Sequence, residues 1–156
     1  MSLITPQQFE ALLPLAVTWA ADQERIILRS GVALTADQLA DAKQVGVAHP
    51  EQVRLLRVVQ IPAPIDPALA AAAAMTRLIS PDTKGMTLRY GIFIRTDCWE
   101  QRLLVVHELV HTMQYERLGG FEAFLRPYLS ECLTPPGYPH GPMEREAIAT
   151  SERLCG

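Results

Sequence analysis

An apolar segment with three ionisable residues in its middle limits the possible folds of this chain more than any other feature. Residues 103–110 are mostly apolar, yet residues 107–111 read H-E-L-V-H. A capping pattern at Asp97 and the pair Gly119-Gly120 enclose the segment, which predicts a helix of about twenty residues. Because apolar side chains occur on more than one side, this helix should lie in the middle of the fold. The chain must then supply partners for two histidines and a glutamate, which are costly to bury alone.

The spacing of the two histidines indicates a metal ion. Residues four apart on a helix lie one above the other, so His107 and His111 can both direct a ring nitrogen at one ion about 2 Å away. Glu108 is rotated by about 100° from His107 and can reach a metal-bound water instead. We therefore expect one zinc ion, two histidine ligands and Glu108 as the base that takes a proton from that water. The alternative is a chance motif of core residues, which explains one buried histidine better than all three polar side chains.

A catalytic zinc usually has three protein ligands, so a third must come from elsewhere in the chain. The downstream candidates are Glu116, Glu122, Glu131, His140, Glu144, Glu146 and Glu152. We favour Glu144, because it lies at the start of a helix that follows a rigid proline-rich loop. This arrangement holds a carboxylate in a fixed position relative to the rest of the fold. Its other explanation is a first-turn acid that the helix dipole favours.

The two faces of the last helix separate Glu144 from Glu146. Positions three, four and seven beyond Glu144 form a small, apolar surface suited to packing on the central helix: Ala147, Ile148 and Ser151. The corresponding positions beyond Glu146 form a more solvated face: Ala149, Thr150 and Arg153. The sequence therefore predicts that Glu144 is the ligand and that Glu146 is not.

The order of these residues resembles that of the gluzincins, the zinc peptidases whose third ligand is a glutamate. The H-E-x-x-H motif is followed, 33 residues after its second histidine, by E-x-x-A on another helix. With Gln114 and the preceding strand of residues 91–95, the segment is similar to the smallest gluzincins. The resemblance covers residues 86–155. It implies three ligands and one base: His107, His111 and Glu144, with Glu108.

One position departs from that resemblance. Many gluzincins place an aspartate shortly after the ligand glutamate, where it steadies a histidine, and this chain has Ile148 there. The resemblance thus assigns no residue to that role, although a metal-bound imidazole usually has such a partner. Gln114 shares the histidine face and can hydrogen-bond the site, without an assigned catalytic role.

The spacing of apolar residues and the positions of capping residues, glycine and proline predict the remaining elements. Helices are expected over residues 6–30, 36–45, 67–78, 121–133 and 142–156, and strands over 53–61 and 86–95, with a bend at Gly91. This is an α+β pattern: helices around a small, mostly antiparallel sheet, with zinc between the central and last helices. We expect one zincin-like domain over residues 1–156, with a helical part at 1–50 and the sheet and metal site at 51–156.

Charge and composition disfavour some classes of function. The net charge is −3 and no basic cluster occurs, which disfavours nucleic-acid binding. The longest apolar run, residues 68–75, is too short to cross a membrane, and residues 1–5 lack the basic start of a secretory signal. A cytoplasmic protein is therefore expected. Cys98, Cys132 and Cys155 lack metal-site spacing and are predicted to be buried free thiols.

The expected function is a zinc-dependent metallopeptidase, more endopeptidase than exopeptidase, with a peptide or protein as substrate. The peptide is predicted to pair with the strand of residues 92–95. The alternative is a non-enzymatic, zinc-stabilised protein-binding module, which a fourth ligand such as His140 would favour. Tyr138 and His140 are weak candidates for stabilising an oxyanion, since a place in a proline-rich loop also fits a structural role. Tyr115 is predicted to serve in packing.

Overall fold

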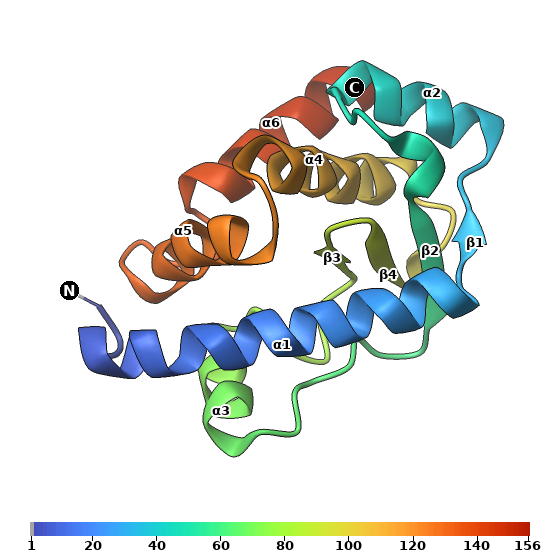
Figure 1. Ribbon diagram of the computed structural model, residues 1–156. Helices are drawn as coiled ribbons and strands as arrows, with labels where there is room; N and C mark the ends of the chain where they lie inside the picture. Colours follow the sequence, from blue (N-terminus) through green and yellow to red (C-terminus); the bar gives the residue numbers. More distant parts are fainter. Residues whose placement is uncertain (1) are drawn as a thin grey trace.

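The structure is a computed structural model that describes residues 2–156. These residues form six α-helices and a four-stranded sheet (Figure 1). The helices are α1 (Pro6–Ser30), α2 (Ala36–Val45), α3 (Pro67–Met75), α4 (Arg102–Leu118), α5 (Phe121–Leu133) and α6 (Pro142–Cys155). The strands are β1 (Val32–Ala33), β2 (Arg54–Val58), β3 (Gly85–Leu88) and β4 (Gly91–Arg95). The predicted α+β class is confirmed.

The sheet is mixed. Its order is β1-β2-β4-β3; the central pair β2 and β4 is parallel, and both outer pairs are antiparallel. A parallel pair needs a long crossover, and here α3 and the loops around it lie between β2 and β4 in sequence. Because β4 pairs on both sides, the expectation that residues 92–95 accept a peptide is wrong. The outer strand beside β4 is β3.

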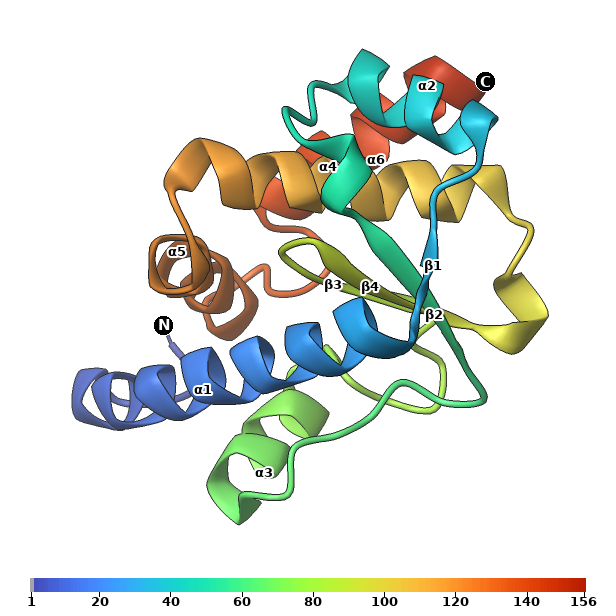
Figure 2. The ribbon, with the colours of Figure 1, turned by 45° about the vertical axis from the view of Figure 1, so that its right-hand side comes forward.

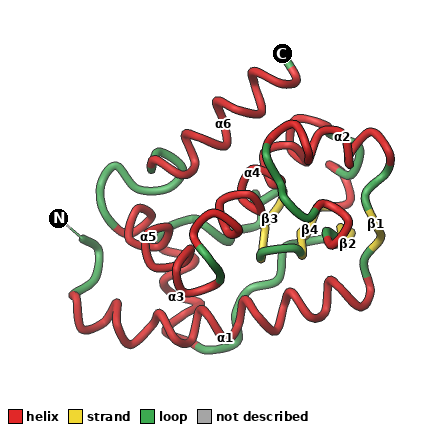
Figure 3. Tube along the Cα trace, turned by 45° about the horizontal axis from the view of Figure 1, so that its top comes forward, coloured by secondary structure: helices red, strands yellow, loops and turns green. Residues whose placement is uncertain are grey.

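Helices cover both faces of the sheet. Helix α1 lies on one face and α4 on the other, with α2 and α6 packed on the far side of α4 (Figure 2). Alternate side chains of a strand point to opposite faces, so Phe93 joins the cluster beneath α1 and α5, whereas Ile92 and Ile94 join that beneath α2 and α4. The short strands lie among the helices (Figure 3). The predicted burial of the central helix is thereby confirmed.

Local signals explain most helix ends. Thr5 and Thr35 accept hydrogen bonds from the backbone of Gln8 and Gln38, and both glutamines bond back to the threonine backbone, which completes two capping boxes. Gly119 ends α4 in the left-handed conformation. The predicted helices that become α1, α2, α5 and α6 are confirmed to within one residue.

Three boundaries differ from the prediction. Residues 86–95 form a hairpin rather than one bent strand, and Arg89 takes a positive φ of 61° at its turn. Helix α4 begins at Arg102, because Thr96–Cys98 form a separate 3₁₀ turn. Helix α3 ends at Met75 instead of residue 78, where the chain turns through Arg77, also at positive φ.

A buried glutamate holds the hairpin in place. Glu24 of α1 is only 3% exposed and accepts hydrogen bonds from the guanidinium of Arg89 and the backbone N–H of Tyr90. From the other side, the Thr112 hydroxyl of α4 donates to the Arg89 carbonyl. The turn is thus bonded to both covering helices, which fixes β3 beside α4.

The cysteines and the helix lengths bear on two further predictions. All three cysteines are free; Cys98 and Cys132 are buried as predicted, and Cys155 is half-buried. Within residues 2–156, none of the helices combines the length and the apolar character needed to cross a bilayer.

Candidate metal centre

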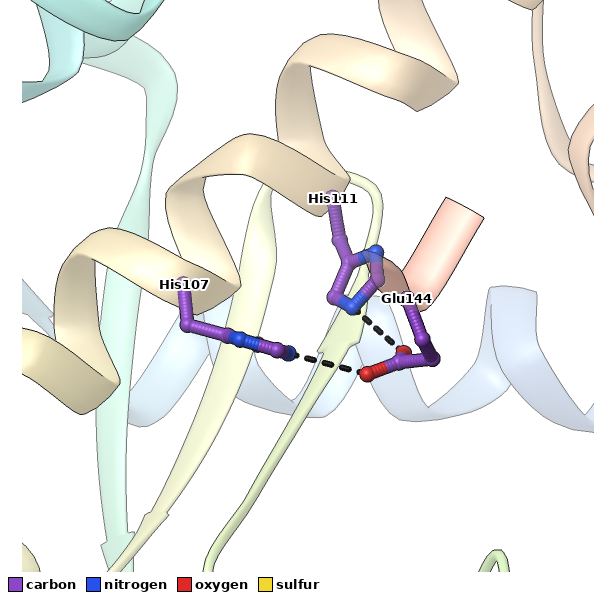
Figure 4. Close-up of side chains that lie close together, drawn as sticks. All are labelled: His107, His111 and Glu144. Atoms are coloured by element: carbon purple, nitrogen blue, oxygen red, sulfur yellow. Dashed lines mark hydrogen bonds and ion pairs between the residues drawn. The ribbon is translucent and has the colours of Figure 1, made fainter. Parts of the chain in front are cut away.

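Three side chains from two helices converge at one point, as Figure 4 shows. His107 Nε2 lies 3.0 Å from one carboxylate oxygen of Glu144, and His111 Nε2 lies 2.7 Å from the other. One ligand atom from each residue lies within 4.8 Å of the other two. The structure therefore brings together the two predicted histidines of α4 and the predicted glutamate of α6.

The geometry of α6 explains the position of Glu144. Pro142 begins the helix, so Glu144 lies in its first turn, where the residue is 5% exposed. The carboxylate of Glu131 in α5 accepts a hydrogen bond of 3.0 Å from the backbone N–H of Met143 and so satisfies one free donor of this turn. Gly141 leaves room for that contact, since a Cβ there would lie 2.8 Å from Glu131.

The donor set suits a metal ion. Two imidazole nitrogens and one carboxylate are ligands that zinc accepts, with a fourth position left for water or substrate. Two atoms each about 2 Å from one ion can be up to about 4 Å apart, and both nitrogen–oxygen distances fall within that span. The His107, His111 and Glu144 group can therefore hold a metal ion.

Gln114 forms the hydrogen bond to a histidine for which the resemblance assigned no residue. Its amide N–H donates to the Met143 carbonyl (3.0 Å) and to Glu146 (2.7 Å), so its oxygen faces His111. His111 Nδ1 lies 2.7 Å from that oxygen and must carry a hydrogen to donate to it. The bond therefore leaves Nε2 as the nitrogen available to a metal. Arg117 in turn holds Glu146 through two hydrogen bonds.

We expect Gln114→Met to weaken zinc binding by about 10- to 100-fold, since the ring of His111 loses the acceptor that fixes its orientation. Competition with a chromogenic chelator measures the affinity, and circular dichroism checks that the variant is folded. The matched control is Gln44→Met, at an exposed position of α2. Unchanged zinc affinity in folded Gln114→Met would remove the orienting role.

Tyr128 completes the surroundings of Glu144. Its hydroxyl donates a hydrogen bond of 2.7 Å to the carboxylate oxygen that also faces His111. The residue is 8% exposed, and its ring stacks on Phe124 of the same helix. Sequence reasoning missed this residue, because nothing in the pattern of α5 relates it to Glu144, sixteen residues further on. It restrains the carboxylate in the orientation that a ligand needs.

Glu108 lies beside the three ligands without joining them. The residue is 5% exposed, and one carboxylate oxygen accepts a hydrogen bond of 2.8 Å from the Thr87 hydroxyl of β3. The same hydroxyl is 3.0 Å from the backbone oxygen of Glu108. Gly85 leaves space for this side chain, since a Cβ there would lie 3.2 Å from Glu108 Cγ. The strand therefore fixes the predicted base, through two residues that the sequence did not single out.

Burial and the neighbouring charges shift the pKa values of His111 and Glu144 in opposite directions. Burial by itself lowers the pKa of His111, but the hydrogen bond and negative charge of Glu144 outweigh it and raise that pKa from 6.5 to about 9. Burial raises the pKa of Glu144, but the hydrogen bonds from both histidines outweigh it and hold that pKa well below 4.5. Without metal, His111 and Glu144 are therefore an ion pair at neutral pH.

This ion pair gives the metal-free protein a specific pH dependence. The raised pKa of His111 contributes stability that is complete below about pH 6.5 and is lost as pH rises through about 9. The lowered pKa of Glu144 contributes stability that is present above pH 4.5 and is lost on acidification. The chelated protein should therefore lose stability from pH 6.5 to 9.

Zinc should reverse that trend, because a histidine must lose its proton to bind a metal. We expect the rise in melting temperature caused by zinc to grow between pH 6 and 9, while the melting temperature of the chelated protein falls. Thermal unfolding with zinc and with chelator across this range measures both. The chelated Glu144→Gln variant, which lacks the negative charge, should show a flatter profile. A rising melting temperature in the chelated wild type would contradict the ion pair.

The other candidate ligands have different roles or lie elsewhere. Glu116 accepts hydrogen bonds from the backbone of Ala48 and His49 and from Tyr90, so it anchors the loop after α2. Glu131 caps α6, as described above. Three further candidates are exposed and outside the ligand group: Glu122, His140 and Glu152. Tyr115 is 1% exposed and stacks on Phe124, in agreement with its predicted packing role.

Two hollows meet at the site. One is a cleft of about 370 Å³, lined by the turn before β3, the start of α4 and the side of α6 that carries Glu144, Ile148 and Ser151. The other is a cavity of about 120 Å³ between α1, α3, β3 and α5. Both are lined by five residues: Gly85, His107, Glu108, Tyr138 and Glu144. Of the two residues considered for an oxyanion, Tyr138 thus lies at the site and His140 does not.

Comparisons with protein-family models, with curated proteins and with solved structures found no match for this chain. The chemistry that the site can perform therefore follows from its own geometry. That geometry comprises three convergent ligand atoms, a separate buried carboxylate and a cleft that reaches both.

Proposed function

We propose that the protein is a zinc-dependent metallopeptidase, with His107, His111 and Glu144 as zinc ligands. The observation that carries the proposal is the position of Glu108, which is buried next to the ligand group, bonded to Thr87 and left out of the ligand set. A carboxylate that served only to hold metal would belong to that set. One that must exchange protons with a substrate needs contact with the cleft, and Glu108 lines it.

Each residue then has a definite task. When bound, zinc would supply a Lewis acid for the scissile carbonyl and acidify the attacking water. Glu108 accepts the proton of that water and returns it to the leaving amine, so the peptide is cleaved into an acid and an amine. Burial raises the pKa of Tyr138, and the charges of Glu144 and Glu108 add to this effect. Its hydroxyl therefore keeps its proton and can donate to an oxyanion.

The outer strand beside the cleft supports a peptide as substrate. One side of β3 pairs with β4, and no strand within residues 2–156 pairs with its other side. Gly85, at the start of β3, lines the cleft together with Glu108. An extended peptide that pairs with this edge at Gly85, where β3 meets the cleft, would pass the site, which moves the proposed pairing from β4 to the start of β3. Pairing with an extended chain fits an endopeptidase, which cleaves bonds away from the ends of its substrate.

The binding-module alternative has less support. A fourth protein ligand such as His140 would favour it, because such a ligand would close the metal site to substrate. His140 is exposed and lies outside the ligand group. In addition, Gln114 and Arg117 already tie α4 to α6 through Glu146, so the packing of α6 does not depend on a metal alone.

A peptide-library digest tests the proposal. We expect the zinc-loaded protein to cleave internal peptide bonds. Cleavage should stop after treatment with a chelator and resume after zinc is restored. Mass spectrometry of the fragments identifies the cleaved bonds and distinguishes endopeptidase from exopeptidase products. A fully zinc-loaded preparation that cleaves nothing in a broad library would overturn the peptidase and favour the binding module.

A further inference from the structure

The cavity on the inner side of the site has one polar end. Away from the ligands it is lined by aliphatic and aromatic side chains of α1, α3 and α5, among them Phe9, Leu12, Trp19, Leu69, Leu129 and Leu133. At the site it is lined by His107, His111, Glu108 and Glu144. A ligand that fills it must therefore be apolar, with a polar group only where it meets the ligands.

The size of the cavity limits that ligand. A water molecule occupies about 30 Å³ of liquid, and an apolar cavity of about 150 Å³ accommodates benzene. A cavity of about 120 Å³ therefore has room for an apolar group of roughly four to six carbon atoms. A long lipid chain exceeds this volume, and a methyl group leaves most of it empty.

We propose that this cavity is a specificity pocket, which takes an apolar group of four to six carbons attached next to the carbonyl that reacts at the metal centre. The cleft on the other side of His107, Glu108 and Glu144 holds the rest of the substrate. This inference rests on the proposed function and adds the substrate class. The group can be the side chain of a residue in a peptide or a short acyl chain, since both present the same apolar surface.

The N-terminal part of the fold forms one wall of this pocket. Helices α1 and α3 contribute no ligand, yet Leu13, Ala16 and Ala73 form one side of the cavity. Ala16 and Ala73 are small residues in positions where a larger side chain would occupy the space. The cavity is therefore a feature of the packing of α1 and α3 beneath the metal centre.

Binding of straight-chain hydroxamates to the zinc-loaded protein tests the pocket without any turnover. The hydroxamate head binds zinc and the chain length is varied from acetohydroxamate to decanohydroxamate, with affinity measured by calorimetry. We expect affinity to rise about fourfold per methylene up to about six carbons and then to level off. Trp19 lines the cavity, so in a Trp99→Phe background its fluorescence should respond to the longer chains and not to acetohydroxamate.

Substitutions that fill the cavity provide test variants, each with a matched control on the same helix. Ala16→Leu should abolish most of the gain with chain length and leave the affinity for acetohydroxamate unchanged, whereas Ala11→Leu, exposed on the same helix, should change neither. Ala72→Leu places the same block on α3 and serves if Ala16→Leu does not fold, with the exposed Ala74→Leu as its control.

The outcomes separate this inference from the proposed function. Equal affinity for all chain lengths would overturn the pocket and leave the metal centre in place. Failure of both acetohydroxamate and hexanohydroxamate to bind would overturn both. Comparison of N-acetyl-leucine hydroxamate with 4-methylpentanohydroxamate identifies the source of the apolar group: equal or tighter binding of the leucine compound indicates a peptide side chain, and at least tenfold weaker binding indicates an acyl chain.

Discussion

Glu108→Gln is expected to keep zinc and fold while it lowers the rate of peptide hydrolysis by a factor on the order of 10² to 10⁴. The amide has nearly the same shape as the carboxylate, and its oxygen can still accept the hydrogen bond from Thr87. It cannot accept a proton from the attacking water. Because Glu108 lies outside the ligand group, zinc content should stay near one ion per chain.

The measurement needs a control for the charge change itself. Glu100→Gln removes a carboxylate from an exposed position just before α4 and should cleave peptides at the wild-type rate. Both variants are compared with the wild type at equal zinc content, determined by elemental analysis. If Glu108→Gln hydrolysed peptides as fast as the wild type in a preparation free of other proteases, Glu108 would no longer be a candidate for the base.

The sequence predicted the helices well because their ends are set locally. The capping boxes at Thr5 and Thr35 and the glycine that ends α4 need only residues within one turn. The hairpin was missed for the opposite reason. Its turn at Arg89 depends on bonds to Glu24 in α1 and Thr112 in α4, which lie far away in sequence, and no glycine–asparagine signal occupies the turn.

Strand order shows the same limit. The apolar run of residues 92–94 identifies a strand but not its neighbours, and the position of β4 between β2 and β3 follows from a crossover through α3. As a result, the sequence assigned the peptide-binding edge to β4. The edge nearest the candidate metal centre belongs to β3, whose Thr87 donates a hydrogen bond to Glu108 and whose Gly85 leaves space for the Glu108 side chain.

Site residues that a pattern within a single helix identifies were predictable. Residues that contact the site from other elements were not. The H-E-x-x-H spacing identifies both histidines and the base, and the apolar face of α6 identifies Glu144: Ala147 and Ser151 are buried, whereas Ala149 and Arg153 are exposed. Tyr128, Thr87 and the capping role of Glu131 come from other elements. Only the packed structure places them within hydrogen-bond distance of the ligands or their helix.

Glu144→Ala should weaken zinc binding by more than the roughly 10- to 100-fold that loss of an outer partner costs, because it removes one of three ligands. Glu146→Ala should leave the affinity nearly unchanged. Although Glu146 lies on the same helix, it acts on the site only through Gln114, which keeps its bond to the Met143 carbonyl. Competitive chelator titration of the two variants under identical conditions gives the ranking.

A second substitution separates ligation from packing. Glu144→Ala also removes the acceptor of the Tyr128 hydroxyl, so part of its effect can come from a disturbed α5. Glu144→Gln keeps the shape and an oxygen for Tyr128, but its neutral amide is a poor zinc ligand, and we expect nearly the same loss of affinity as in Glu144→Ala. If Glu146→Ala instead lost zinc while both Glu144 variants retained it, the ligand would be Glu146. The first turn of α6 would then have to rotate to turn that side chain toward His107 and His111.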